Sequence, residues 1–366
     1  MSLPKIIFLC ASESQPREIK RIQSFISKGY DVEVYGFIRG YYQINKIGGI
    51  TFNSLGVRKS GQNYFYQFFN AAFSLFKVFR KESSKSVIFY SFSFDLALIC
   101  KLFSGQRYIY EISDIVYAYF SFEFLIKLFK NIDKWIIQNS YLSVVTSEGF
   151  TNYLFKKNTF KNIINQPNKL DIFFKKKLSP IKYINQEKIV FSYVGAFRYP
   201  DTVFRFAKVI GEVFKNHEFH FYGDSIYTEE VKKIALKYTN IIYSGAFRNP
   251  EDLESIYNHI DVVVACYDTS SLNERIAIPN KLYEAIFFNK PIIVSTNTFL
   301  AREVQRLQCG FDIVASSDQG IINFINSLKI SEVNRLINQI SQIPKEFSID
   351  DEAVKVHNIL EQTFLK

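Results

Sequence analysis

Short apolar runs alternate with amphipathic segments along the second half of the chain. Between residues 189 and 316, runs rich in Val, Ile and Phe are separated by segments whose apolar residues recur at helical spacing. Regular alternation of strand and helix predicts a parallel, doubly wound α/β sheet. The strands are expected at residues 189–197, 218–224, 240–247, 261–268, 291–296 and 311–316.

The first half has the same kind of pattern in a less regular form. A strand-like run at 6–10 is followed by a turn-rich stretch, a helix that starts near Pro16 and ends at Gly29, and a strand at 31–37. This βαβ unit places its first turn where open α/β sheets bind ligands. Further strands are expected at 86–91, 107–112 and 142–147, and aromatic-rich helices at 63–81 and 117–139.

These patterns predict two Rossmann-like, doubly wound α/β domains, which suits a length of 366 residues. The N-terminal domain is expected at 1–180 and the C-terminal domain at 181–345, with a linker in the polar, Lys-rich stretch 175–187. Residues 346–366 are expected to form a final helix, for which packing back on the N-terminal domain is one option.

The composition narrows the class of protein. Apolar residues make up 48% of the chain and charged residues 22%, values typical of a globular protein. No run of eighteen or more apolar residues occurs, and the start of the chain lacks a signal-peptide pattern, so neither a spanning helix nor a secretory signal is expected. Four widely spaced cysteines without a CxxC pair suit a reducing cytosol, which predicts a cytoplasmic protein.

The net charge of +10 is unevenly distributed. Residues 1–180 contain 25 Lys and Arg against 12 Asp and Glu, or +13, and the remainder contains 20 against 23, or −3. An AT-rich genome could produce such a Lys-rich composition without a functional cause. The alternative is a surface that meets an anionic partner, such as lipid headgroups or a lipid diphosphate. Nucleic acid is not expected, because zinc-finger spacing and a compact basic run are both absent from the sequence.

The segment PNKLYEAIFFNKPIIVS, residues 279–295, combines a helix start with charged residues and a following apolar strand. Lys281 and Glu284 are three residues apart, so they share one face near the N-terminus of the predicted helix. The unpaired N–H groups and the positive dipole at that end suit a diphosphate, and Glu284 could accept hydrogen bonds from two ribose hydroxyls. The alternative is an ordinary ion pair on a solvated helix.

This segment resembles the nucleotide-binding signature of retaining glycosyltransferase family 4 and related enzymes of bacterial polysaccharide biosynthesis with the GT-B fold. The family pattern P-x-K-x-x-E, followed by G-K-P-V-I, is matched here by Pro279, Lys281 and Glu284, followed by Asn289 to Ile293. The resemblance covers residues 189–316 specifically and residues 1–180 diffusely. Further positions that match the family are Val194-Gly195, Tyr222-Gly223-Asp224, Ser244-Gly245 and Asp261.

The resemblance implies roles for individual residues. Glu284 would bind the ribose hydroxyls, Lys281 and Arg198 the diphosphate, and the region from Gly245 to Arg248 would frame the base. The residues with an implied nucleotide- or diphosphate-binding role are Gly195, Arg198, Gly245, Lys281, Leu282 and Glu284. The residues with an implied donor-sugar role are Glu274, Ile276 and Asn280. Where the family has an acidic residue eight positions before the ribose-binding Glu, this sequence has Ile276, and Glu274 is the nearest acid.

The first domain would be the acceptor side in such an enzyme. PREIKR, residues 16–21, is similar to the D-x-R-x-x-R opening of the family without its acidic member, and Glu13 and Arg17 are the acceptor-side candidates. Glu111 and Asp114 stand at a strand end, where a carboxylate could act as general base or orient the acceptor hydroxyl. They are the candidate catalytic residues, with a helix cap or loop turn as the alternative for each.

Metal and membrane expectations follow from two further observations. D-x-D does not occur in the sequence, and a diphosphate held by Lys, Arg and a helix N-terminus requires no metal, so neither a metal site nor a cofactor is expected. The aromatic and basic helices at 63–81 and 117–139 could dip into a membrane interface or belong to the core.

The leading hypothesis is an enzyme that moves a sugar from a UDP- or GDP-sugar to a hydroxyl of a glycan or lipid-linked glycan, in cell-surface polysaccharide synthesis. It would be a cytoplasmic, metal-independent hexosyltransferase, peripheral at the inner face of the membrane if the basic half binds lipid. The alternatives are a sugar-nucleotide 2-epimerase, which shares the two-domain fold, and a non-catalytic nucleotide-sugar-binding subunit.

Overall fold

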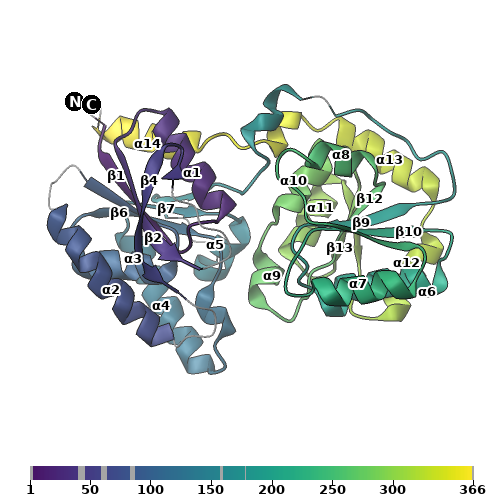
Figure 1. The fold of residues 1–366 in the computed structure, drawn as a ribbon, viewed down its shortest axis with the longest axis horizontal. Coiled ribbons are helices and arrows are strands. Elements are labelled where there is room, and N and C mark those ends of the chain that lie inside the picture. The colour runs from purple at the N-terminus through teal and green to yellow at the C-terminus, as the bar shows by residue number, and fades with distance from the viewer. Residues whose placement is uncertain are drawn as a thin grey trace. The chain divides into compact units, whose positions relative to one another are not determined.

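The computed structural model describes residues 3–39, 46–58, 64–82, 87–156, 160–177 and 179–364 (Figure 1). The chain divides into two compact units. Unit 1 comprises Met1–Asn168 and Asp351–Lys366, and unit 2 comprises Lys169–Asp350. Residues 63, 86, 178, 365 and 366, which belong to predicted elements, lie outside the described residues.

Unit 1 is built on an eight-stranded sheet within the described residues, in the order β3-β4-β2-β1-β5-β6-β7-β8. Every pair is parallel except β3 with β4, which is antiparallel. The chain reverses its direction of travel across the sheet between β1 and β5, which makes their carboxyl ends the switch point of this unit. The strands are β1 Lys5–Cys10, β2 Val32–Ile38, β3 Lys46–Ile47, β4 Ile50–Val57, β5 Val87–Ser91, β6 Arg107–Ile112, β7 Leu142–Val145 and β8 Ile163–Asn165.

Helices cover both faces of this sheet, with α1 and α14 on one face and α2, α3 and α4 on the other (Figure 1). The α1 and α14 side chains Phe25 and Leu360 belong to one buried cluster with Tyr90 of β5. The preceding residue, Phe89, points to the opposite face and packs on Phe79 of α2, with 4.9 Å between ring centroids. The helices are α1 Pro16–Ser27, α2 Tyr64–Lys81, α3 Phe94–Phe103, η1 Val116–Tyr119, α4 Glu123–Asn139, α5 Glu148–Phe155 and α14 Val354–Phe364.

Unit 2 is built on a six-stranded, fully parallel sheet within the described residues, in the order β11-β10-β9-β12-β13-β14. Numbered within the unit, this order is 3-2-1-4-5-6, the arrangement of the Rossmann fold, with the switch point between β9 and β12. The strands are β9 Val190–Val194, β10 Glu218–Tyr222, β11 Ile241–Gly245, β12 Val262–Ala265, β13 Ile292–Ser295 and β14 Gly310–Ile313.

Eleven helical segments connect and extend these strands within the described part of unit 2. Buried side chains form one apolar cluster that includes Phe206 of α6 and a second that includes Ala285 of α10, so the sheet is covered from both sides. The segments are η2 Ile172–Lys176, η3 Pro200–Phe204, α6 Arg205–Val213, α7 Thr228–Lys237, α8 Leu253–Asn258, α9 Leu272–Ile276, α10 Asn280–Phe287, α11 Phe299–Leu307, α12 Asp318–Ser327, α13 Ile330–Ser341 and, last, η4 Lys345–Ser348.

The structure confirms the two doubly wound sheets and differs from the sequence analysis in several elements. Strands β3, β4 and β8 were not predicted, and the helix predicted at 117–139 is broken into η1 and α4. The residue just before the expected linker at 175–187 belongs to the core of unit 2, because the Phe174 ring of η2 is fully buried 5.4 Å from that of Phe287. Unit 2 accordingly begins at Lys169, whereas the expected boundary was at residue 181.

Candidate nucleotide-sugar site

Three glycines end adjacent strands of unit 2 at its carboxyl edge. Gly195, Gly223 and Gly245 follow or close β9, β10 and β11, and all have positive φ, at 124°, 140° and 83°. The N–H of Gly195 donates to the carbonyl of Tyr222 at 2.8 Å, and the N–H of Gly223 donates to that of Gly245 at 2.8 Å. A β-carbon on Gly223 would lie 2.1 Å from the Gly195 carbonyl oxygen, so glycine is required for this contact.

The Lys281 side chain reaches this edge from the first turn of α10. Its Nζ lies 3.0 Å from the position that a β-carbon on Gly195 would occupy, and 4.5 Å from the ring centroid of Tyr193. The side chain is 7% exposed, and burial lowers the pKa of Lys281 from 10.5 to about 8, with the Glu284 charge acting in the opposite direction. A buried cation with a depressed pKa is a site that a bound anion would stabilise.

Glu284 lies on the same helix and is only 4% exposed. Its Oε2 accepts a hydrogen bond from the Tyr257 hydroxyl at 2.7 Å, and its Oε1 accepts one from the Asn280 amide at 2.6 Å. Because Lys281 and Glu284 are both buried, an ion pair on a solvated helix face does not describe them. Neutral donors fix the carboxylate in place, as a group that receives ligand hydroxyls requires.

The start of α10 has the features of an anion site. Its N-cap residue, Pro279, provides no side-chain cap, and its first turn contains no acidic residue. The helix spans eight residues, long enough to present a positive N-terminal end. Leu282 is 1% exposed within the core of the unit, so its backbone is the part available to a ligand.

The turn after β9 contacts the residues that follow β12, on the other side of the switch point. The Tyr199 ring stacks on that of Tyr267 with centroids 4.4 Å apart, and the Thr202 hydroxyl donates to the Cys266 carbonyl at 2.5 Å. Arg198 lies exposed in this turn. Its charge adds to the effect of burial in lowering the pKa of Lys281, as expected for two cations near each other.

Residues predicted to face the donor sugar lie in and beside α9. Ile276 and Arg275 line an open cavity of about 730 Å³, together with Arg302 of α11 and Asp312 of β14. The Glu274 Oε2 atom is buried without a hydrogen-bond partner in the described structure. An unpaired buried carboxylate oxygen has a vacant acceptor position that a ligand hydroxyl could fill.

In the region predicted to frame the base, Gly245 to Arg248, one side chain already pairs with a neighbour in the same turn. Gly245 ends β11, and the Arg248 guanidinium donates to the Asp252 carboxylate at 2.7 Å and 3.2 Å. The Arg248 side chain is otherwise exposed. This pair holds the β11–α8 turn, so the Arg248 charge is already compensated within the loop.

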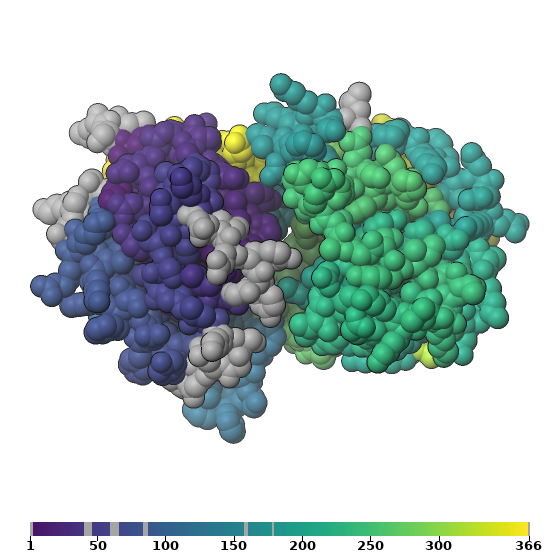
Figure 2. Space-filling view, viewed as in Figure 1, coloured from purple at the N-terminus to yellow at the C-terminus, as the bar shows by residue number. Residues whose placement is uncertain are grey.

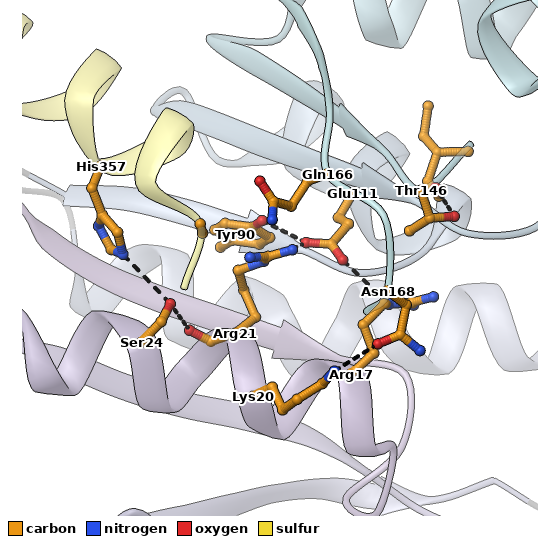
Figure 3. A network of polar contacts seen from close by, with 12 residues as sticks. Arg17, Lys20, Arg21, Ser24, Tyr90, Glu111, Thr146, Gln166, Asn168 and His357 are labelled. Atoms are coloured by element: carbon orange, nitrogen blue, oxygen red, sulfur yellow. Dashed lines mark hydrogen bonds and ion pairs between the residues drawn. The ribbon is translucent and has the colours of Figure 1, made fainter. Parts of the chain in front are cut away.

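Unit 1 contains a buried charged cluster around Glu111, drawn in Figure 3. The fully buried carboxylate accepts hydrogen bonds from the Tyr90 hydroxyl at 2.6 Å and from Arg21 Nε at 3.0 Å, and Arg17 Nε lies 3.2 Å from its Oε1. Burial alone would raise the pKa of Glu111, but the charges of Arg21 and Arg17 outweigh it and lower the pKa. This geometry favours a positioning role for Glu111, which holds Arg17, over the predicted catalytic role.

Other acceptor-side candidates separate into buried and accessible groups. Glu13 is 1% exposed and accepts hydrogen bonds from the backbone N–H of Arg39 at 3.0 Å and from the Ser12 hydroxyl at 3.1 Å, so it fixes the loop after β1. Arg17 is partly exposed on α1. Asp114 is exposed beyond the end of β6 and accepts a hydrogen bond from the Ser113 hydroxyl at 3.3 Å. Asp114 and Arg17 are therefore the candidates that reach solvent.

Sequence reasoning missed the aromatic hydroxyls and rings of the site. Tyr257 holds Glu284 from α8, and Tyr193 and Tyr267 flank Lys281. The tyrosines at 193 and 267 stand at strand ends beside the expected site, which is a usable signal, whereas nothing in the sequence links residue 257 to residue 284.

Two features of the described residues concern metals and membranes. No group of three or more His, Cys, Asp or Glu side chains there could hold a metal ion. Metal independence stays a prediction. None of the described helices combines the length and the apolar character needed to cross a bilayer.

Comparisons with known proteins relate part of this chain to one family and its whole fold to several solved structures. Residues 188–328 match the model of the family Glycosyl transferases group 1. HepE from Anabaena, solved with UDP and glucose, is 15% identical over 98% of both chains, with a TM-score of 0.68. Sucrose-phosphate synthase from Thermosynechococcus elongatus is 12% identical over 99% of both, with a TM-score of 0.74. WaaG, a glycosyltransferase involved in lipopolysaccharide biosynthesis, is 12% identical over 98% of both, with a TM-score of 0.62.

No curated protein matches the sequence. The matched segment contains all three glycines, Lys281 and Glu284 of the candidate site. Over the whole chain the fold is that of the GT-B proteins, and the match to the model of Glycosyl transferases group 1 covers residues 188–328.

Proposed function

We propose that the chain transfers a hexosyl group from a UDP- or GDP-sugar to a hydroxyl of a glycan or lipid-linked glycan, in cell-surface polysaccharide synthesis. The observation that carries the donor half is the buried Lys281 and Glu284 pair in α10, beside the Gly195 turn at the switch point of unit 2. UDP and glucose in the HepE structure and the lipopolysaccharide role named for WaaG favour this direction.

In this proposal the diphosphate lies between the Gly195 turn and the start of α10. Lys281 and Arg198 supply positive charge, and the backbone N–H groups of the first turn, including that of Leu282, supply hydrogen bonds. Glu284 accepts hydrogen bonds from the ribose hydroxyls. The cations and the helix dipole compensate the leaving diphosphate, so no metal is required for that purpose.

The donor sugar is proposed to lie toward α9. Asn280 contributes indirectly, because its amide orients Glu284. Ile276 gives the pocket an apolar wall where relatives have a carboxylate. The unpaired Glu274 Oε2, two residues earlier in the chain, offers an acceptor for a sugar hydroxyl. The sugar is therefore expected to be selected by Glu274 and by the shape of the 730 Å³ cavity.

Unit 1 is proposed to hold the acceptor. Transfer breaks the bond between the sugar C1 and the diphosphate oxygen, forms a bond from C1 to the acceptor oxygen, and requires the acceptor hydroxyl to lose its proton. Asp114 is the exposed carboxylate proposed to orient that hydroxyl or take its proton. Arg17, held by Glu111, is proposed to contact the acceptor, and Glu13 to fix the adjoining loop.

The location proposed for this reaction is the cytoplasmic face of a membrane, with the protein attached peripherally. The charge balance supports it, because residues 1–180 carry +13 and the remainder −3. An anionic bilayer attracts a part of a chain with this excess of Lys and Arg.

Replacing Glu284 by alanine tests the donor site. A thermal-shift screen with UDP and GDP first identifies the nucleotide, because a ligand that binds the native state raises the melting temperature. Calorimetry with that nucleotide should then show affinity weakened by more than about tenfold, since a charged hydrogen-bonding group is lost. Glu332→Ala, which removes an exposed carboxylate on α13, is the matched control and should bind normally. Unchanged affinity in Glu284→Ala would refute the assignment.

Turnover with a panel of UDP- and GDP-sugars tests the reaction type. Release of the nucleoside diphosphate together with transfer or hydrolysis of the sugar is expected. Conversion of the donor to its C2 epimer without release of the nucleoside diphosphate would instead establish the epimerase.

A further inference from the structure

Helix α2 is apolar on both of its sides. Ala71, Leu75, Val78 and Phe79 are buried, and Phe79 packs on the sheet. The opposite side presents four aromatic side chains to solvent at helical spacing. They are Tyr66, Phe69, Phe73 and Phe76, with 64%, 67%, 69% and 49% of their surface exposed. A helix that packs on a sheet normally has a polar outer side, so this second apolar stripe requires a partner.

The neighbouring helices continue the same character. Helix α3 contacts both α2 and α4, so the three helices form one layer over the sheet (Figure 1). At the end of α3, Leu102 and Phe103 are half exposed, and Phe124, Leu128 and Trp135 are exposed along one side of α4. The segments 64–81 and 123–139 lie at the surface of this unit, in the blue part of the colour range in Figure 2.

Cations stand among these apolar side chains. Lys77 Nζ lies 5.5 Å from the ring centroid of Phe73, and Lys101 Nζ lies 5.2 Å from that of Trp135. Arg80 is exposed one turn beyond Phe76 and lies 5.9 Å from its ring. Aromatic rings with cations at their edges are the composition of a helix face that lies in the headgroup region of a bilayer.

We propose that this aromatic–basic surface, formed by the outer sides of α2 and α4 and the end of α3, binds the surface of a bilayer that contains anionic phospholipids. The proposal deepens the peripheral location in the proposed function by naming the surface and the lipid class, and it does not depend on the donor chemistry. The exposed rings enter the acyl boundary while Lys77, Arg80 and Lys101 reach the phosphates.

The positive charges on this surface favour lipid over a protein partner or a second copy of the chain. The cores of protein–protein interfaces are depleted in lysine, whereas here Lys77 and Lys101 stand against the exposed rings. A second copy of the chain would bring the same cations face to face, which is unfavourable. The dimensions also suit a bilayer surface, because α2 has 18 residues and is about 27 Å long at the usual helical rise.

Trp135 makes the test direct, because it is the chain's one tryptophan and lies on this surface with 40% of its area exposed. The full chain is mixed with vesicles of phosphatidylcholine alone or with an equal part of phosphatidylglycerol. We expect sedimentation with the anionic vesicles, weakened by salt, together with a blue shift of Trp135 fluorescence and quenching by brominated lipid. Equal binding to both vesicles would overturn the role of lipid charge.

The double variant Phe69→Ser/Phe73→Ser removes two exposed rings without touching the buried side of α2. Its partition into anionic vesicles should fall by at least about tenfold, since a bilayer no longer buries those rings. The matched control is Ile226→Ser/Leu236→Ser, which removes two exposed apolar side chains from unit 2 and should bind like the unaltered chain.

Two outcomes overturn the proposal. One is vesicle binding by Phe69→Ser/Phe73→Ser equal to that of the unaltered chain. The other is a dimer in analytical ultracentrifugation that this variant dissociates, with no vesicle binding, which would assign the surface to a second copy. Nucleotide affinity, measured on the same samples, should stay unchanged, so a failure here is separate from a failure of the donor-site assignment.

Discussion

Replacing Lys281 by methionine is expected to stabilise unit 2 and to remove nucleotide binding. Methionine has nearly the length of lysine and no charge, so it fits the space between the Tyr193 ring and the Gly195 turn without requiring hydration. The unliganded protein bears the energetic cost of burying the ammonium group, which the Glu284 charge and the Tyr193 ring offset only in part and a bound anion would offset further.

The magnitude follows from the pKa of Lys281, which burial lowers from 10.5 to about 8. Each unit by which the pKa is lowered corresponds to about 1.4 kcal/mol. The charged side chain therefore lowers the free energy of unfolding by about 3 kcal/mol at pH 7. The lost contact between the ammonium group and the Tyr193 ring offsets about 1 kcal/mol of this. The variant should therefore unfold with a free energy about 2 kcal/mol higher than that of the unaltered chain at pH 7.

The pH dependence has a definite sign. Below pH 8 the lysine is protonated in both the folded and the unfolded state, so the full cost is present. Between pH 8 and 10.5 the folded state releases the proton while the unfolded state keeps it, and the cost declines. The advantage of Lys281→Met should thus be largest near pH 7 and nearly absent at pH 10.

Urea unfolding followed by circular dichroism measures the change. The two units can unfold separately, so Trp135 fluorescence, which reports on unit 1, identifies which transition belongs to unit 2. Lys290→Met is the matched control, because burial also lowers the pKa of Lys290 to about 8, and this residue follows the other end of α10. It should show the same pH-dependent stabilisation with normal nucleotide affinity in calorimetry.

Two results would refute this reasoning. Wild-type nucleotide affinity in Lys281→Met would remove Lys281 from the diphosphate site. Equal stability of the variant and the unaltered chain at pH 7 would show that burying the ammonium group does not destabilise the folded state. That result would contradict the lowered pKa of Lys281.

Three further predictions concern other residues of the two units. Asp114→Asn should lower turnover by about a hundredfold and leave nucleotide affinity unchanged, and full activity would remove this residue from the mechanism. Glu111→Gln should lower the free energy of unfolding by about 3 kcal/mol in urea titrations, because two arginines lose their buried counter-charge; an unaffected midpoint would contradict this. Gly223→Ala should lower the free energy of unfolding by at least about 3 kcal/mol, because the new β-carbon meets the Gly195 carbonyl. The control Gly29→Ala, at a glycine with positive φ and open space around it, should lower it by about 1 kcal/mol.

Much of unit 2 could be predicted because local pattern and topology agree there. Each strand is a short apolar run between amphipathic helices, and this arrangement allows few topologies other than a parallel sheet. The signature at Lys281 and Glu284 follows a strand and opens a helix, so its position at the carboxyl edge was predictable. The strands β3 and β8 have two and three residues, too few for the alternation of side chains to show in the sequence.

The case of Glu111 shows what a strand pattern leaves undetermined. The sequence places a carboxylate near the end of β6, a position from which side chains often reach a ligand. Which face of the strand carries it depends on the neighbours: Tyr110 points to α4 and hydrogen-bonds to Asp133, so Glu111 points to the opposite face, beneath α1. There Arg17 and Arg21, one helical turn apart, close over it. Both arginines are visible in the sequence as part of PREIKR, but their pairing with a residue some ninety positions away exists only once α1 packs over β5 and β6. Asp114, three residues further along, lies beyond that cover. This difference in burial is the physical reason why the acceptor-side chemistry is proposed for Asp114 and the support of Arg17 for Glu111.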